Sequence, residues 1–142
     1  MCGRFALIVS GEDIADYFGL SESPSLVPRY NIAPSQPVLC VGLSRDLKPA
    51  PAVFRWGLVP GWAADTKKTP INARAETAAG RPTFGEALRK RRCLVPATGF
   101  YEWEPLPGRR KRPWHFRLAG GGLFAFAGLW EAWRPPSGGR PC

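Results

Sequence analysis

The hydrophobic residues of this sequence occur in short runs separated by Pro and Gly. These two residue types, 16 of each in 142 residues, interrupt the chain at short intervals and are typical of turns. Each run is about four to eight residues long and rich in β-branched or aromatic residues, as buried strands are. The sequence therefore predicts the α+β class, a β-rich fold of mostly antiparallel strands with a few short helices.

The expected strands span residues 5–9, 38–43, 52–58, 93–96, 99–104, 114–118 and 123–130. Two short helices are expected, because Ser10 with Asp13 and Thr83 with Glu86 have the spacing of capping boxes. Residues 20–37 are rich in Ser and Pro, and we expect a long ordered loop there, of the kind that often carries function. The length is that of one domain.

The first five residues, Met1-Cys2-Gly3-Arg4-Phe5, place a cysteine where removal of Met1 would make it the chain terminus. Cys2 would then carry an α-amine and a thiol on adjacent carbons, with ordinary pKa values of ~8 and ~8.5. Such a pair can attack an aldehyde twice, first to form an imine and then to close a thiazolidine ring. The same residue could instead attack an amide, with its own amine as the base. The sequence leaves both reactions open.

Charge and aromatic content together favour a polyanionic partner. The formal net charge is +9, from 20 Lys and Arg against 11 Asp and Glu, and the chain holds six Trp and eight Phe. Arginine suits phosphate contacts and bases stack on aromatic rings, so single-stranded nucleic acid fits best. The basic runs at 89–92 and 109–112 could form a phosphate-binding rim, and a simple solvated surface is the alternative. The alternative is a soluble basic protein without a polyanion partner.

The four cysteines do not predict a metal site. They include no Cys-x-x-Cys pair and the chain has one His, so we expect no zinc site and no cofactor. Cys40 and Cys93 lie in apolar runs and are expected to be buried thiols. No signal peptide and no run of membrane-spanning length is found, which favours a reducing, cytoplasmic or nucleoid-associated location in which Cys2 stays free to react.

Four polar residues are candidates for chemistry or binding. Glu102 lies between two aromatic residues, where it could act as a general acid and base or simply face solvent. Asn72 and Arg74 are one residue apart, so an extended segment would bring an amide donor and a phosphate-binding guanidinium into the same space, although a structural role is the alternative. Arg4 could fix a phosphate beside Cys2.

Two tryptophans, Trp56 and Trp62, bound a segment whose Pro and Gly residues hold the backbone. Their indoles could stack on bases or enter a duplex end as a wedge, and core packing is the alternative. The Gly and Pro that flank them favour an exposed elbow.

Five blocks of the sequence resemble the SOS response-associated peptidase (SRAP) family. They are Met1-Cys2-Gly3-Arg4-Phe5, Arg29-Tyr30-Asn31-Ile32-Ala33-Pro34, Trp56-Gly57-Leu58-Val59-Pro60-Gly61-Trp62, Ile71-Asn72-Ala73-Arg74-Ala75-Glu76-Thr77 and Cys93-Leu94-Val95-Pro96-Ala97-Thr98-Gly99-Phe100-Tyr101-Glu102-Trp103. The blocks occur in the family's order and cover nearly the whole chain. The resemblance implies an SRAP-like domain over residues 1–142, with its strands in a barrel-like sheet arrangement and a positively charged groove.

The resemblance also implies a role in the response to DNA damage. SRAP proteins lose their initial Met and crosslink through a thiazolidine to abasic sites in single-stranded DNA, which shields the lesion from strand breakage. By the match, Cys2 is the crosslinking residue, Asn72 positions the sugar or the terminus, and Glu102 assists ring opening and imine chemistry.

The matched blocks extend to residues that contact DNA. Arg4 and Arg74 match arginines that contact phosphates, and Trp62, with Pro34 nearby, matches a wedge that separates stacked bases. Trp56 joins this set as a candidate for base stacking. The expected partner is single-stranded DNA that contains abasic sites, bound by a monomer that does not associate with membranes.

The chain departs from the family pattern in one respect. The family carries a further catalytic His in a His-x-Arg-Met-Pro-like motif on a later strand, and no such motif occurs here. The single His of the chain, His115, lies in an earlier strand and does not match it. We therefore expect a domain that is incomplete at its C-terminus, with the acid–base steps of that His impaired.

Two other functions stay open. An N-terminal-nucleophile cysteine peptidase would cleave a peptide, or its own Met1, without DNA. A non-catalytic module that binds single-stranded DNA would retain Met1, because a blocked amine cannot close the thiazolidine ring.

Overall fold

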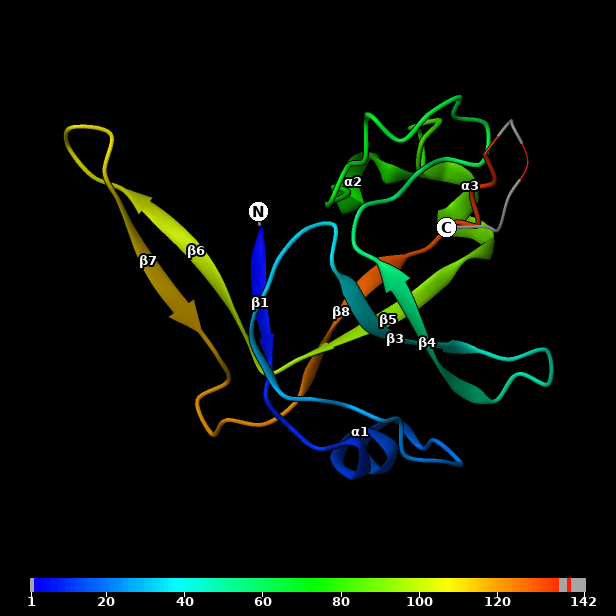
Figure 1. Ribbon diagram of the computed structural model, residues 1–142, viewed down its shortest axis with the longest axis horizontal. Helices are drawn as coiled ribbons and strands as arrows, with labels where there is room; N and C mark the ends of the chain where they lie inside the picture. Colours follow the sequence, from blue (N-terminus) through cyan, green and yellow to red (C-terminus); the bar gives the residue numbers. More distant parts are fainter. Residues whose placement is uncertain (1, 136–137, 139–142) are drawn as a thin grey trace.

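Two four-stranded antiparallel sheets make up most of the computed structural model, which describes residues 2–135 and 138 (Figure 1). The strand order of the first sheet is β2-β1-β6-β7, and that of the second is β4-β3-β5-β8. The first comprises β1 (Arg4–Leu7), β2 (Arg29–Ile32), β6 (Gly99–Pro105) and β7 (Lys111–Phe116). The second comprises β3 (Pro37–Leu43), β4 (Pro49–Arg55), β5 (Arg92–Ala97) and β8 (Phe124–Leu129).

The α+β class and the antiparallel pairing are confirmed, whereas the barrel-like closure is not. Closure requires the edge strands to pair with one another. Within the described residues, β2 and β7 remain the edges of one sheet, and β4 and β8 the edges of the other. The sheets meet instead at a corner, because Thr98 alone separates β5 from β6. Its hydroxyl donates to the carbonyl of Ala6 and accepts from the amide of Ile8, each at 3.2 Å.

Aromatic side chains fill the space between the sheets. Phe5 is 2% exposed and contacts Trp56 edge-on, with ring centroids 5.3 Å apart. Its centroid lies 6.0 Å from that of Phe126 on β8, and Phe100 on β6 contacts the same ring at 5.8 Å. Because side chains alternate along a strand, burying Phe5 turns Arg4 to the opposite face of the first sheet.

The first helix, α1 (Gly11–Phe18), forms where its predicted capping box lies. The Ser10 amide donates to Asp13 Oδ2 at 2.9 Å, and the Asp13 amide donates to Ser10 Oγ at 3.1 Å. Gly19 ends the helix with φ 65°, a conformation that costs glycine little. Ile14 of this helix is fully buried in the core. With eight residues, α1 is the longest helix of the described chain, and none is long and apolar enough to cross a membrane.

Several local expectations were wrong. The strands expected at 52–58 and 114–118 lie earlier in the chain, as β4 (Pro49–Arg55) and β7 (Lys111–Phe116). The helix α3 (Gly85–Lys90) begins after Phe84 without a side-chain cap, so the Thr83–Glu86 box does not form. Backbone bonds from Phe84 and Gly85 to the Arg81 carbonyl start that helix instead. The expected loop at residues 20–37 contains β2. Strand β1 ends at Leu7 rather than residue 9, because the next amide bonds to the Thr98 hydroxyl.

Replacing Phe5 with Ala should lower the free energy of unfolding by about 3–5 kcal/mol, since it opens a cavity between the two sheets. Urea denaturation followed by circular dichroism measures this change. Val27→Ala, at a side chain 76% exposed, is the control and should alter stability by less than about 0.5 kcal/mol. Equal effects of the two substitutions would contradict the assigned core; Phe5→Leu replaces Phe5→Ala if the latter does not fold.

Candidate active site

Cys2 lies at the N-terminal end of β1, between two segments that are distant in sequence. Its Sγ donates to the carbonyl of Arg4 at 3.2 Å. Its own carbonyl accepts a hydrogen bond of 2.8 Å from Nδ2 of Asn72, a residue 70 positions along the chain. Both Cys2 and Asn72 are half-buried. The amide of Asn72 therefore fixes the backbone of the candidate nucleophile.

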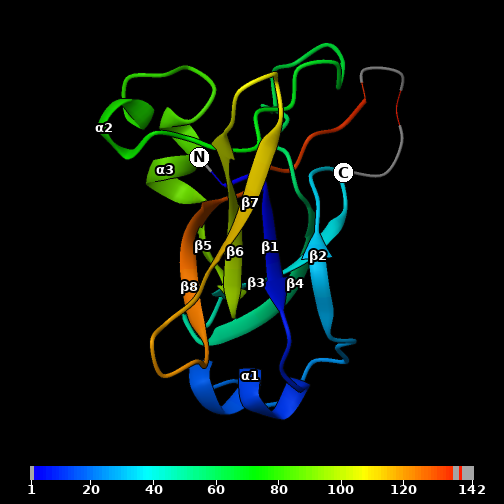
Figure 2. The ribbon, with the colours of Figure 1, turned by 90° about the vertical axis from the view of Figure 1, so that its left-hand side faces the viewer.

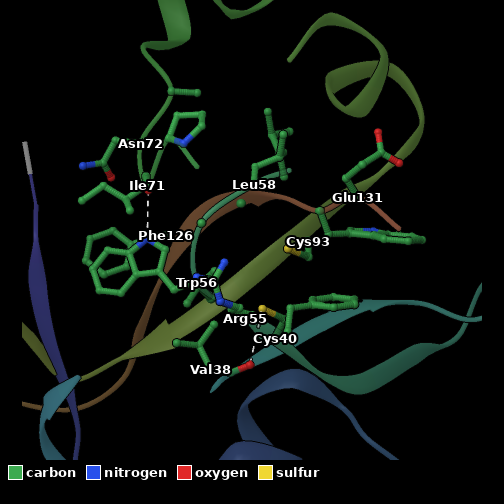
Figure 3. A pocket seen from close by; sticks show the side chains of 18 of the residues that line it. Val38, Cys40, Arg55, Trp56, Leu58, Ile71, Asn72, Cys93, Phe126 and Glu131 are labelled. Atoms are coloured by element: carbon green, nitrogen blue, oxygen red, sulfur yellow. Dashed lines mark hydrogen bonds between the residues drawn. The ribbon is translucent and has the colours of Figure 1, made fainter. Parts of the chain in front are cut away.

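Trp56 holds the segment that carries Asn72. Its indole Nε1 donates to the carbonyl of Ile71 at 2.9 Å, as Figure 3 shows, while its ring packs on Phe5. The Leu58 amide donates to the Pro70 carbonyl at 3.0 Å and joins the same two stretches of chain. The structure thus places Trp56 half-buried behind Asn72, between the core and the site.

Glu102 on β6 is the nearby carboxylate that acts on Cys2. Strand β6 pairs with β1 through Tyr101 and Arg4, so Glu102 lies one residue beyond this pair, level with the first residues of the chain. Burial, and after it the negative charge of Glu102, raise the pKa of the Cys2 thiol. The thiol is therefore less ionised near neutral pH than an exposed cysteine, and nucleophilic attack by Cys2 calls for a base that removes its proton.

A cavity of about 270 Å³ extends from Cys2 and Asn72 into the space between the sheets. Figure 3 shows Asn72 and Ile71 at one side, with Cys93 and Cys40 further in. Cys40 and Cys93 are 2% and 8% exposed, so the expectation of buried thiols is confirmed. A hydrogen bond with Cys93, and burial, raise the pKa of Cys40. These thiols line the cavity and are buried, whereas Cys2 is half-buried.

The predicted DNA-contacting residues come from four different parts of the chain and differ in exposure. Nη1 of Arg4 donates to Oδ1 of Asn31 on β2 at 2.9 Å. Arg74 is exposed and immediately precedes α2 (Ala75–Ala78). The side chain of Trp62 is 70% exposed, as expected of an elbow. Pro34 is half-buried in the turn after β2, and the next amide bonds to the Trp56 carbonyl at 2.8 Å.

The structure brings Cys2, Asn72 and Glu102 together, with Trp56 as their support. It adds Asn31, to which the sequence assigned no role because its strand was taken for a loop. The only signal was its place beside Tyr30 and Ile32, both strand-forming residues. Among the described residues, no group of three or more His, Cys, Asp and Glu side chains could hold a metal ion.

The sequence and the fold of this chain are similar to those of known proteins. The chain is 42% identical over 146 residues to the abasic site processing protein YoqW of Bacillus subtilis (strain 168), covering 97% of this chain and 63% of the relative. It is 34% identical over 127 residues to the abasic site processing protein YedK of Escherichia coli (strain K12), covering 85% and 55%. A phage-related protein of Bordetella bronchiseptica superimposes with a TM-score of 0.77 at 33% identity, covering 95% and 62%.

The chain thus spans less than two thirds of the length of these relatives. The family model of the SOS response associated peptidases (SRAP) matches residues 1–141, which include Cys2, Asn72 and Glu102. With the relatives and the shared fold, this match shows that the chain belongs to the SOS response associated peptidase (SRAP) family.

Proposed function

We propose that this protein captures abasic sites in single-stranded DNA by forming a covalent bond through Cys2. The observation that carries the proposal is the half-buried Cys2, whose carbonyl accepts from Asn72 and whose thiol lies under the influence of Glu102. The names of relatives such as YoqW, which is an abasic site processing protein, support DNA with abasic sites as the target.

The chemistry needs an α-amine at Cys2, and therefore the removal of Met1, which lies outside the described residues. The amine adds to the sugar aldehyde and loses one water to give an imine. The thiol then adds across the C=N bond, so that a C–S bond forms and its proton ends on nitrogen. The thiazolidine closes without any change of oxidation state. We assign the transfer of protons between these steps to Glu102, a role supported by the action of its charge on the Cys2 thiol.

Positive charge and exposed aromatic rings suit a single strand better than a duplex. The net charge of +9 attracts phosphates, and Arg4 and Arg74 offer guanidinium groups at the surface near the site. Trp62, 70% exposed, offers a flat face to an unpaired base. An abasic sugar in an unpaired strand lacks the stacking that would hold it away from the cavity mouth.

Incubation of the Met1-processed protein with an abasic single-stranded oligonucleotide should give an adduct that survives heating in denaturant. Cys2→Ala should abolish the adduct, and Cys2→Ser should give at most a reversible imine, because an alcohol is a weaker nucleophile than a thiol. Denaturing gels measure the yield, and intact mass verifies that Met1 is absent. An adduct of undiminished yield with Cys2→Ala would overturn the proposal, and peptide cleavage without DNA would favour the peptidase function.

Asn72→Ala should slow adduct formation about tenfold, because the hydrogen bond that fixes the Cys2 backbone is worth roughly 1–1.5 kcal/mol. Single-turnover rates with abasic DNA measure the effect. Affinity for an undamaged strand is the control and should stay close to the wild-type value, while the melting temperature should fall by only about 3–6 °C, so that the variant is still folded at the temperature of the assay. Wild-type rates in Asn72→Ala would show that this bond has no part in the reaction.

Alkylation of Cys2 by iodoacetamide should reach half its limiting rate at a higher pH than alkylation of the same cysteine in urea-unfolded protein. The direction follows from the raised pKa of the folded thiol. Glu102→Gln should move the midpoint to lower pH, since a nearby negative charge is lost. Peptide mapping by mass spectrometry separates Cys2 from the other cysteines. An unchanged midpoint in Glu102→Gln would show that the carboxylate does not act on the thiol.

A further inference from the structure

The outer half of the β6–β7 hairpin extends beyond the sheet to which it belongs. Strand β6 pairs with β1 only as far as Tyr101, whereas its pairing with β7 continues to Pro105 and Lys111. Figure 1 shows this two-stranded arm projecting on one side of the N-terminus, opposite the segment that carries α2. Every residue of β7 is exposed. The arm therefore presents both of its faces to solvent beside the candidate site.

The two faces of the hairpin differ in charge. Directly paired residues share a face, and the pairings place Arg4, Tyr101 and His115 in one row across three strands. Two residues further out, the same face carries Trp103, and then Lys111. We call this the outer face, because it lies opposite the face of the first sheet on which Phe5 is buried. In Figure 2 the first sheet lies in front of the second, and β7 crosses in front of β6. None of its members is acidic.

The opposite face carries both carboxylates of the strand. Glu102 pairs with Trp114, and Glu104 pairs with Arg112. Glu104 accepts from the indole of Trp114 at 2.9 Å and lies 3.7 Å from the Arg112 guanidinium. A polyanion that follows the hairpin therefore meets less repulsion on the outer face.

The tip of the hairpin holds cations without acidic partners. Arg109, Arg110 and Lys111 are exposed, and in the described part of the chain no ion pair involves them. The backbone turn is closed by a bond of 2.9 Å from the Leu106 amide to the Arg110 carbonyl. Of the four cations at 109–112 only Arg112 is paired within the described residues, with Glu104, whereas at 89–92 Arg91 pairs with Glu131 at 2.8 Å and Lys90 with Glu86. Charge at the tip thus remains available to an external anion.

We propose that the outer face and the tip form a track for the single strand that flanks the abasic site. The strand leaves the site at Arg4, stacks a base on Trp103, which is 39% exposed, and binds phosphates with Arg110 and Lys111. The stack of Tyr101 on His115, with ring centroids 4.8 Å apart, lies between these points and forms a flat surface. This inference rests on the proposed function, because it extends the binding site of the same DNA.

The length of the track follows from strand geometry. Pro105, which pairs with Lys111, lies three residues beyond Glu102, so the first tip cation is roughly 10 Å from Glu102 at about 3.3 Å per residue. Successive nucleotides of a stacked strand advance by about 3.4 Å along its axis. The tip should therefore engage DNA about three nucleotides from the lesion, and shorter flanks should gain nothing from it.

The test measures binding of an undamaged oligothymidine of about 16 nucleotides across a salt series, using Arg110→Gln/Lys111→Gln. Affinity should fall about tenfold or more at low salt, and the slope of log K against log salt should become shallower by roughly 1.4, about 0.7 for each lost phosphate contact. The matched control is Arg45→Gln/Lys48→Gln, which removes two exposed cations from the β3–β4 turn at the opposite end of the molecule. This control should change both quantities by less than half as much.

Equal losses in the two double variants would show that net charge alone acts, and no loss in the hairpin variant would show that the tip does not bind; either result overturns the proposal. Lys111→Gln alone, which retains the bond from Arg110 to the Pro107 carbonyl, serves if the double variant melts early. The undamaged probe contains no aldehyde, so this result is independent of the crosslink. Failure of Cys2 to form an adduct would overturn the proposed function and leave the binding measurement valid.

The choice of face is tested with two tryptophans of the same hairpin. Trp103→Ala should lower affinity for the same oligothymidine at least about fivefold, the lower end of what one stacked base contributes. Trp114→Ala, at a side chain 50% exposed on the opposite face, should leave affinity within about twofold. A larger loss with Trp114→Ala than with Trp103→Ala would assign the strand to the other face and contradict the track.

Discussion

The burial of Phe5 between the two sheets is the interaction on which the candidate site depends. It anchors β1 as an inner strand, flanked by β2 and β6, and so fixes the direction in which the first residues emerge. Because neighbours on a strand face opposite sides, the same burial places Arg4 on the outer face. A reactive terminus would otherwise be among the most mobile parts of a chain. Here a core aromatic residue lies only three positions from Cys2.

A second anchor comes from the other side of the site. Trp56 packs on Phe5 and donates to the Ile71 carbonyl, so one pair of rings holds both Cys2 and Asn72. The nucleophile and its amide partner are thus positioned by the same part of the core. We expect a disturbance of this aromatic contact to reach the site even though neither ring carries out chemistry. Core and site are coupled in this protein because they share side chains.

Of the two capping boxes expected from nearby residues, one forms and one does not. The box of Ser10 and Asp13 forms because both partners lie within one turn, and no distant segment competes for them. The box expected at Thr83 does not form, since bonds to the Arg81 carbonyl shift the start of that helix. Strand β2 was missed because its partner, β1, lies more than 20 residues earlier. Barrel closure also depends on distant pairing, and the described edges do not make it.

The sequence by itself determined the β-rich class, the family and the candidate nucleophile, because each follows from residue types in a fixed order. It also supplied Asn72 and Glu102 as candidates, but without any distance between them. Only the tertiary structure decided that the Asn72 amide bonds to the Cys2 carbonyl and that the Glu102 charge reaches the Cys2 thiol. It alone decided which hairpin face is free of carboxylates, because cross-strand register, and not composition, determines which side chains share a face.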